Sequence, residues 1–324
     1  MTEQHNAVTV PGDSHRRIVE IDFIKAIMIL LMIAFHIVFI GDTYPYAKKI
    51  VYTFHMPAFL IISGYMLNTG RSVRSYLLTL LWIFIPYTVM ESGYTFMASL
   101  LPIREHVDNL TVGLLVEKIL LHPLGPYWYL HTLMLCGLTC FFVFRLPRIT
   151  LLPRLVILAL CYAFLSRCLH VVSLPCAFYF MAGVVLRHSG TPFLSFFRPS
   201  LLSAVPFLLI ACMPACLDKS TPGGIAMVYL AMSLCLVLFG YCRGAVLRLM
   251  LFIGRNTLVL LLFSPVFTVL AKIYQPVLLR VEPTGMLFLA VSLAFAVAGC
   301  FFIAAIMDRL GISKCFFGKR QNLK

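Results

Sequence analysis

Charged residues are scarce in this sequence. Of its 324 residues, 12% are Asp, Glu, Lys or Arg and 61% are hydrophobic, and the mean hydropathy is +0.96. A soluble domain carries roughly a quarter charged residues, so much of this surface is expected to face lipid instead of water. The sequence contains no long polar stretch that would indicate a separate soluble domain. We therefore predict a cytoplasmic N-terminal segment (1–19), one transmembrane domain (20–307) and a basic cytoplasmic tail (308–324).

Several signatures of metal and hydrolase sites are missing. The eleven cysteines form no C-x-x-C pair, and most lie in apolar runs, where small polarizable side chains pack helices together. No H-E-x-x-H segment indicates a zinc site, and no G-x-S-x-G segment indicates a serine hydrolase. The prediction therefore includes no metal.

Apolar runs long enough to cross ~30 Å of hydrocarbon recur along the whole chain. The polar first 19 residues do not resemble a cleavable signal, so the run from Ile24 to Ile40 is expected to remain as the first span. The fold class we predict is an all-α integral membrane bundle of about ten transmembrane helices. Their expected intervals are 20–40, 50–68, 76–100, 127–144, 150–166, 174–187, 200–216, 223–242, 250–273 and 284–307. A short amphipathic helix is expected at 110–121, at the outer interface.

The distribution of Lys and Arg predicts the orientation. With the N-terminus inside, 17 of the 26 Lys and Arg residues fall on the inner side, 8 fall on the outer side, and Lys25 lies within the first span. The outer eight are Lys48, Lys49, Arg104, Lys118, Arg167, Lys219, Lys272 and Arg280. Because positive residues favour the cytoplasmic side, both termini are expected in the cytoplasm, in an inner-membrane protein that contacts lipid. This orientation accounts for the excess of basic residues, so no nucleic-acid partner is predicted.

The first span carries two ionisable residues that are costly in a membrane. Lys25 and His36 are 11 residues apart, close to three helical turns, so both project from one face with about 16 Å between them along the axis. Lys25 is expected near the inner surface and His36 near the outer end. The alternatives are that Lys25 only extends to the inner headgroups and that His36 only packs.

Two more histidines are expected in the outer half of the bilayer. His55 lies near the outer end of the second span and His131 near the outer end of the fourth. Three helices would thus bring His36, His55 and His131 to a similar depth. Either additional histidine could instead be structural, and Trp128 could belong to the aromatic belt at the interface.

Two segments carry a family resemblance. The segment 20–38, EIDFIKAIMILLMIAFHIV, is similar to the opening helix of the acyltransferase-3 family, which has a basic residue, ten residues and then a histidine. The segment 54–67, FHMPAFLIISGYML, resembles the second helix of that family. Looser similarity extends to 126–133, 178–186 and 252–262. Lysine at the basic position is typical of the fucose 4-O-acetylase-like branch.

The resemblance implies transfer of an acyl group, most often acetyl, from acyl-CoA to a hydroxyl of a sugar or glycan. A neutral histidine suits removal of the hydroxyl proton near pH 7, so His36 is assigned as the base, with direct transfer and an acyl-histidine both open. Lys25, Arg71 and Arg74 are expected to bind the CoA phosphates. His55 is expected to orient His36 or to bind the acceptor. The residues expected to bind the substrate are His55, His131 and Trp128.

Two functions from other classes are compatible with the same composition. A transporter or flippase of lipid-linked sugars would also need a helical bundle with a polar stripe, although no internal repeat favours it. A non-catalytic scaffold of an envelope complex would leave Lys25, His36 and His55 unexplained.

Overall fold

The computed structural model describes residues 17–100 and 106–323, and all regular structure in these two stretches is helical. Most of the expected segment 1–19 therefore lies outside the described residues, as do Arg104 and Lys324. The longer helices are α1 (Val19–His36), α3 (Pro45–Met66), α4 (Val73–Leu100), α6 (Trp128–Val143), α7 (Leu151–Arg167), α8 (Leu174–His188), α11 (Pro222–Tyr241), α12 (Gly244–Arg255), α13 (Thr257–Leu270) and α15 (Met286–Arg309).

Shorter helices connect or flank these elements. They are α2 (Val38–Thr43), α5 (Val112–Leu120), α9 (Phe193–Phe196), α10 (Ala204–Ala211), α14 (Gln275–Val281) and α16 (Ile312–Phe317), with 3-10 turns η1 (Gly125–Tyr127), η2 (Leu201–Ser203), η3 (Pro214–Cys216) and η4 (Ala271–Ile273). Each of the ten expected intervals contains a helix, and α5 lies where a short helix was expected.

Two intervals differ from uniform spans. In 200–216 the α-helix has only eight residues, with a 3-10 turn on either side. In 250–273 the chain bends by 87° between α12 and α13. The bend occurs at Asn256, whose backbone leaves the helical region and whose side-chain amide donates to the Phe252 carbonyl at 2.8 Å. Such a local bond competes with the continuation of a helix.

Among the described residues, four helices are long and apolar enough to cross a membrane. They are Val73–Leu100, Gly125–Val143, Pro222–Tyr241 and Met286–Arg309, and the bent pair α12–α13 makes a fifth. Helix α1 is not among them, because Glu20, Asp22 and Lys25 interrupt its 18 apolar-rich residues. The fold is thus an all-helical protein with several apolar helices, while the count of ten spans stays a prediction.

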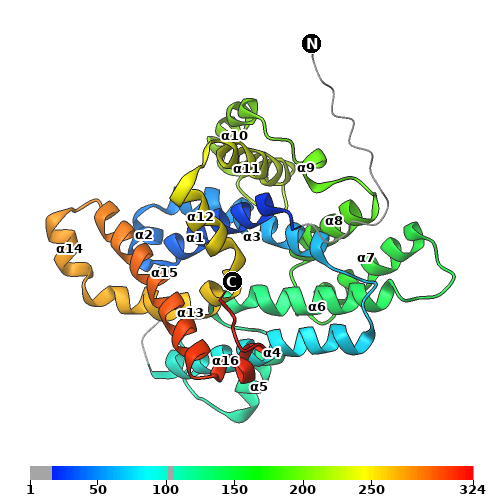
Figure 1. The fold of residues 1–324 in the computed structure, drawn as a ribbon, viewed down its shortest axis with the longest axis horizontal. Coiled ribbons are helices and arrows are strands. Elements are labelled where there is room, and N and C mark those ends of the chain that lie inside the picture. Colours follow the sequence, from blue (N-terminus) through cyan, green and yellow to red (C-terminus); the bar gives the residue numbers. More distant parts are fainter. Residues whose placement is uncertain (1–16, 101–105, 324) are drawn as a thin grey trace.

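Helix α1 occupies the centre of the molecule (Figure 1). It contacts α3, α11, α12, α13 and α15, so it is covered on several sides. Ile24, Ala26 and Met28 have no exposed surface. A helix enclosed in this way can hold polar side chains in fixed directions, because its neighbours supply partners and exclude lipid.

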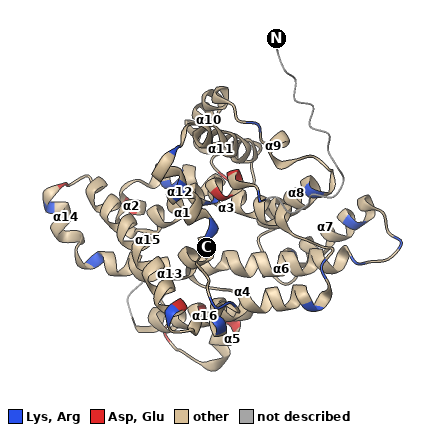
Figure 2. Ribbon diagram, viewed as in Figure 1, with Lys and Arg blue, Asp and Glu red and all other residues tan. Residues whose placement is uncertain are grey.

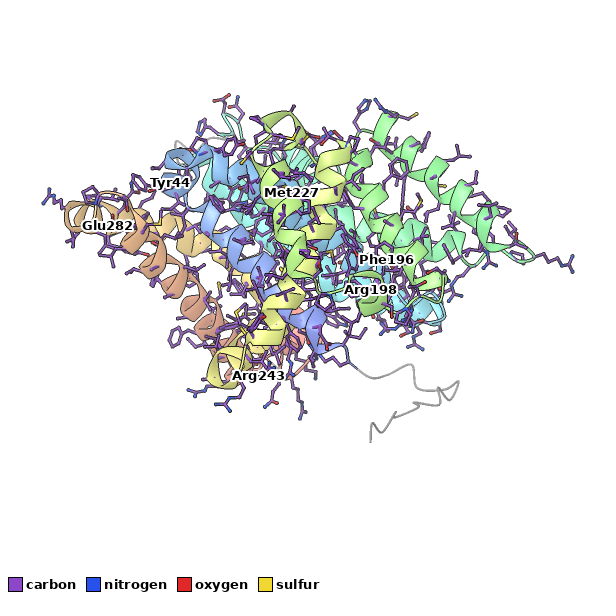
Figure 3. All side chains as sticks on the ribbon, turned by 90° about the horizontal axis from the view of Figure 1, so that it is seen from above. Tyr44, Phe196, Arg198, Met227, Arg243 and Glu282 are labelled. Carbon is purple, nitrogen blue, oxygen red and sulfur yellow. The ribbon has the colours of Figure 1, made fainter. Side chains whose placement is uncertain are left out.

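Apolar side chains cover much of the outside. On α4, Leu77, Leu81, Val89 and Phe96 are each more than 40% exposed, which suits contact with lipid tails. Charged residues lie mainly at helix ends and in loops (Figure 2). Viewed from above, Tyr44 after α2 and Arg243 after α11 lie at opposite edges of the molecule (Figure 3).

The residues predicted as a basic tail, 308–324, pack against the bundle as far as the structure describes them. Ser313 is fully buried and Phe317 is 4% exposed, and α16 contacts α4. The Asp308 carboxylate accepts the backbone N–H of Asn322 at 3.0 Å and that of Leu323 at 3.2 Å. These contacts fold the segment back along the helices.

Glycine allows α3 and α8 to pack backbone against backbone. A Cβ atom at Gly64 would overlap the carbonyl oxygen of Phe180, and one at Gly183 would overlap that of Ile61. Small residues at a helix crossing are a principal means of association in membranes. Because α3 carries His55, this crossing also fixes the position of that histidine.

The crossing predicts a difference between two alanine substitutions. Gly183→Ala should lower Tm in detergent by about 5 °C, because the added methyl group forces the helices apart. Gly240→Ala is the matched control, since Gly240 lies in α11 with open space around it, and alanine there should be neutral or stabilising. Equal Tm values for the two variants would contradict the close packing.

Candidate active site

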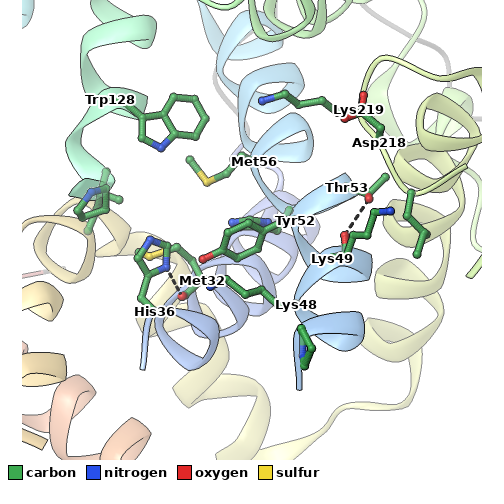
Figure 4. A pocket seen from close by; sticks show the side chains of 15 residues that line it. Met32, His36, Lys48, Lys49, Tyr52, Thr53, Met56, Trp128, Asp218 and Lys219 are labelled. Atoms are coloured by element: carbon green, nitrogen blue, oxygen red, sulfur yellow. Dashed lines mark hydrogen bonds between the residues drawn. The ribbon is translucent and has the colours of Figure 1, made fainter. Parts of the chain in front are cut away.

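A cavity of about 580 Å³ lies between α1, α3, α6 and the loop before α11. His36, Tyr52, His55, Trp128, Lys48 and Lys219 are among its lining residues, and we call it the histidine cavity. Figure 4 shows His36, Tyr52, Met56 and Trp128 directed into the same space. The cavity has a size typical of a small-molecule site, about 300–1,000 Å³.

His36 is the last residue of α1. Its Nδ1 lies 2.7 Å from the carbonyl oxygen of Met32, a bond drawn in Figure 4. A carbonyl oxygen only accepts, so Nδ1 must carry the proton and donate it. Nε2 is then the ring atom of His36 that can take up a proton.

His55 repeats this geometry on α3. Its Nδ1 lies 2.8 Å from the carbonyl oxygen of Val51, which again makes Nδ1 the donor. The side chain is buried, at 2% exposure, and Nε2 has no hydrogen-bond partner among the described residues. The structure therefore brings His36 and His55 to one cavity, and in both rings Nδ1 is the nitrogen that donates to a backbone carbonyl.

Tyr52 lies between the two histidines. Its ring centroid is 6.0 Å from that of His36 and 5.0 Å from that of His55, and its hydroxyl donates to the Phe35 carbonyl at 3.4 Å. Sequence reasoning missed this residue. Its position three residues before His55, on the same face of the helix, could have indicated that Tyr52 belongs to the site.

Trp128 begins α6, directly after the 3-10 turn η1, and lines the histidine cavity. The ammonium group of Lys219 lies 5.6 Å from its ring centroid, within the range of a cation–π contact. Gly125, with a φ of 57°, provides the left-handed conformation from which the chain enters the turn. The indole is thus directed toward the histidines.

His131 lies apart from this group, although it is on the same helix as Trp128. Its Nε2 is 2.9 Å from the carbonyl oxygen of Leu120, at the end of α5, and its ring packs against Tyr87 with centroids 6.3 Å apart. It lines a separate cavity formed with α4 and α5. The expected group of three histidines is therefore a pair, and His131 joins α6 to α5.

Lys25 takes part in a charged cluster at the other end of α1. Its ammonium lies 2.9 Å from the Asp22 carboxylate, as the spacing of three residues led us to expect. Arg17 and Arg255 also approach that carboxylate, at 2.5 Å and 3.9 Å. Arg255 enters because Gly254 lets α12 touch the α1 backbone, where a Cβ atom would overlap the Asp22 carbonyl. Sequence reasoning had no means to place Arg255 there.

Lys25 also lines a cavity of about 300 Å³ that adjoins the histidine cavity. Met32, Met56 and Leu261 line both, so these side chains form the boundary between them. We call the second space the Lys25 cavity.

A third cavity, of about 270 Å³, contains Arg71 and shares Ser63, Met66 and Leu133 with the Lys25 cavity. Arg74 is exposed and does not line any of the three. Arg71, Lys25 and His36 thus line a series of adjoining cavities.

A buried carboxylate on α4 holds the segment before Trp128. Glu91 has no exposed surface, and its Oε1 accepts the backbone N–H of Leu124 at 2.7 Å. Tyr94, one turn along α4, packs edge-on against Tyr127, with ring centroids 5.9 Å apart. Sequence reasoning also missed Glu91, although an acidic residue inside an apolar helix is itself a signal of function.

The described residues contain no group of three or more His, Cys, Asp or Glu side chains arranged to hold a metal ion. His36 and His55 are thus not part of such a group of potential metal ligands among the described residues. Their surroundings are aromatic, apolar and basic, with one acid, Asp218, in the lining of the cavity.

Comparison with known proteins identifies the class of protein to which this arrangement belongs. A family model described as an acyltransferase domain matches residues 18–305, and this match together with the apolar helices defines a membrane acyltransferase. Within that class, the chain belongs to the acyltransferase-3 family. The family inferred from segments 20–38 and 54–67 is thereby confirmed. No curated protein and no solved structure gives a significant match to the chain.

The position of Glu91 predicts an effect on Trp128 without any contact between them. Glu91→Ala should remove the anchor of the 124–128 segment, shift the Trp128 fluorescence and lower the rate of acyl transfer, because a buried donor left without its acceptor costs about 1–3 kcal/mol. Glu91→Gln keeps an acceptor oxygen and should retain most of both properties.

The chain has two tryptophans, so the Trp128 signal is the part of the emission that Trp128→Phe removes. An unchanged Trp128 signal in folded Glu91→Ala would show that the carboxylate does not position this segment.

Proposed function

We propose that the protein is an O-acyltransferase of the inner membrane, most simply an O-acetyltransferase. It would move an acyl group from cytoplasmic acyl-CoA to a hydroxyl of a cell-surface or lipid-linked glycan. The observation that carries the proposal is the series of cavities from Arg71 through Lys25 to His36. A donor approaching from one side and an acceptor from the other could meet at such a site.

In the proposed reaction His36 acts as the general base. Its Nε2 removes the proton of the acceptor hydroxyl, the hydroxyl oxygen bonds to the thioester carbonyl carbon, and the carbon–sulfur bond breaks. The proton on His36 then passes to the departing thiolate. The bond from Nδ1 to the Met32 carbonyl supports this role, because it fixes the ring and its tautomer. In the alternative form of the proposal, Nε2 of His36 first takes the acyl group from the thioester, the thiol leaves, and the acceptor hydroxyl then takes the acyl group from His36.

Lys25 and Arg71 are proposed to bind the phosphates of the donor, with Arg74 at the entrance. Their charge suits polyanions, and Lys25 is held by Asp22 at a cavity wall. His55 is proposed to orient the reacting groups beside His36. We propose a cytoplasmic location for these donor-binding residues and for both termini, which the distribution of Lys and Arg supports.

For the acceptor, the proposal relies on Trp128 and His55, which line the histidine cavity. An indole face suits the apolar face of a sugar ring. His131 is proposed to act indirectly, because its bond to the Leu120 carbonyl supports the chain that leads to Trp128. Lysine at position 25 favours the fucose 4-O-acetylase-like branch.

A transporter of lipid-linked sugars is the competing proposal, and one experiment separates the two. Purified protein in detergent is incubated with labelled acetyl-CoA and a sugar acceptor. Transfer of label in the absence of a membrane barrier supports an enzyme, whereas no transfer with any acceptor favours transport.

Replacing His36 should abolish transfer. His36→Ala removes the base and is expected to lower the rate by at least about a hundredfold, with membrane insertion and Tm retained. The matched control is His122→Ala, because His122 is exposed and lies outside the histidine cavity. Full activity of His36→Ala would end the proposed mechanism.

Lys25 should affect donor binding more than chemistry. Lys25→Ala is expected to raise KM for acyl-CoA about tenfold, because a charge-assisted contact to phosphate is lost, whereas Lys25→Arg should retain most of the affinity. Steady-state kinetics at varied acyl-CoA concentrations measures the difference. Equal KM values in both variants would indicate that Lys25 only extends to the headgroups.

A further inference from the structure

On the basis of the proposed function, we propose that the acceptor glycan carries an anionic group, a carboxylate or a phosphate, close to the hydroxyl that is acylated. The anion is bound by Lys48, Lys49 and Lys219 in the histidine cavity.

The charge of the cavity is one-sided. Its ionised lining residues are three lysines and a single acid, Asp218. Lys48 and Lys49 come from the first turn of α3, and Lys219 comes from the loop before α11. Two distant segments of the chain thus place cations around one space, and Figure 4 shows all three lysines around it.

Asp218 does not neutralise these lysines by pairing. Its carboxylate accepts the backbone N–H of Ser220 at 2.8 Å and also the Ser220 hydroxyl. These bonds lower the pKa of Asp218, with smaller contributions from the charges of Lys219 and Lys49, so Asp218 stays ionised and offsets part of the positive charge without forming an ion pair. Within residues 17–100 and 106–323, no ion pair includes Lys48, Lys49 or Lys219.

The three ammonium groups are held in place, and each retains N–H donors for a ligand. Lys49 donates to the Pro214 carbonyl at 3.0 Å, while Lys48 lies 5.5 Å from the centre of the Tyr52 ring and Lys219 lies over Trp128. An ammonium has three donors, and no more than one of them is used in any of these contacts. An anion that entered the cavity would find preplaced donors on more than one side.

The preferred orientation in the membrane does not explain why lysines gather at the histidine cavity. The outer side is expected to hold only eight Lys and Arg residues, because positive charge there opposes the preferred topology. Three of the eight line the histidine cavity. Lys272 and the acid Asp42 line an adjoining cavity of about 440 Å³ that also contains His36, Lys48 and Tyr52. Half of the outer cations therefore gather beside the proposed base.

This arrangement suits an acceptor whose charge orients it. An anion on the acylated sugar or on its neighbour would be fixed by the lysines while Trp128 covers the ring. One hydroxyl would then be directed toward His36. A neutral sugar would leave three ammonium groups of a partly enclosed cavity with Asp218 as their one acidic neighbour in the lining.

Matched sugar pairs test the proposal. Methyl glycosides of glucose, galactose and mannose are compared with the corresponding methyl glycuronides, which carry a carboxylate in place of the hydroxymethyl group, and with the sugar 1-phosphates. Binding is followed by the tryptophan fluorescence that Trp128→Phe removes, in detergent without phospholipid so that no lipid headgroup occupies the cavity. The uronides or the phosphates are expected to bind about tenfold more tightly than the neutral sugars at low salt. Added salt should reduce this preference.

The triple substitution Lys48→Gln, Lys49→Gln and Lys219→Gln should abolish the preference for charged sugars. Lys118→Gln is the matched control, since Lys118 is another lysine of the outer set but pairs with Glu117 outside this cavity. Equal binding of neutral and charged sugars, no binding of either, or a preference that survives the triple substitution would each overturn the proposal.

The relative preference of carboxylate and phosphate identifies the class of acceptor. Acyl transfer from labelled acetyl-CoA is measured separately with the same proteins. Absence of transfer counts against the proposed function, whereas transfer without any charge preference counts only against the anionic acceptor.

Discussion

The structure depends on the cost of placing ionised groups inside an apolar bundle. Asp22 and Lys25 lie on the central helix α1. Each lowers the energetic cost of burying the other, because their charged groups lie 2.9 Å apart. Arg17 and Arg255 complete the cluster and join α12 to α1 at the same point. With this end of α1 fixed, the other end presents His36 at a defined position beside α3. The polar residues that the proposed chemistry needs are thus also the residues that determine how the central helices pack.

Local patterns in the sequence predicted the elements of the site that depend on one helix. The spacing of Lys25 and His36 placed both on one face, and the three-residue spacing of Asp22 and Lys25 indicated their pair. The positions of ten helical intervals also followed from apolar runs. His131 shows the limit of this reasoning, because similar depth in the membrane does not determine which neighbour a side chain faces. In the structure that neighbour is the Leu120 carbonyl.

Residues contributed by tertiary packing could not be predicted in the same way. Lys219 lies in a loop and reaches Trp128 only because that loop folds over α3 and α6. Arg255 reaches Asp22 through a glycine contact between two helices far apart in sequence. The bend at Asn256 accompanies a bond from its side-chain amide to the Phe252 carbonyl, within an interval predicted as one span. Each of these features arises from tertiary contacts, which the hydropathy pattern of a sequence cannot predict.

The boundary between the histidine cavity and the Lys25 cavity has a consequence for the membrane itself. It consists of Met32, Met56 and Leu261, all buried and none able to hold a file of water molecules. Methionine side chains are unbranched and adjust their shape readily, so they can close around a slender chain and meet again when it leaves. In the proposed orientation, such a protein would join two aqueous compartments chemically while the barrier to protons and ions between them stays intact.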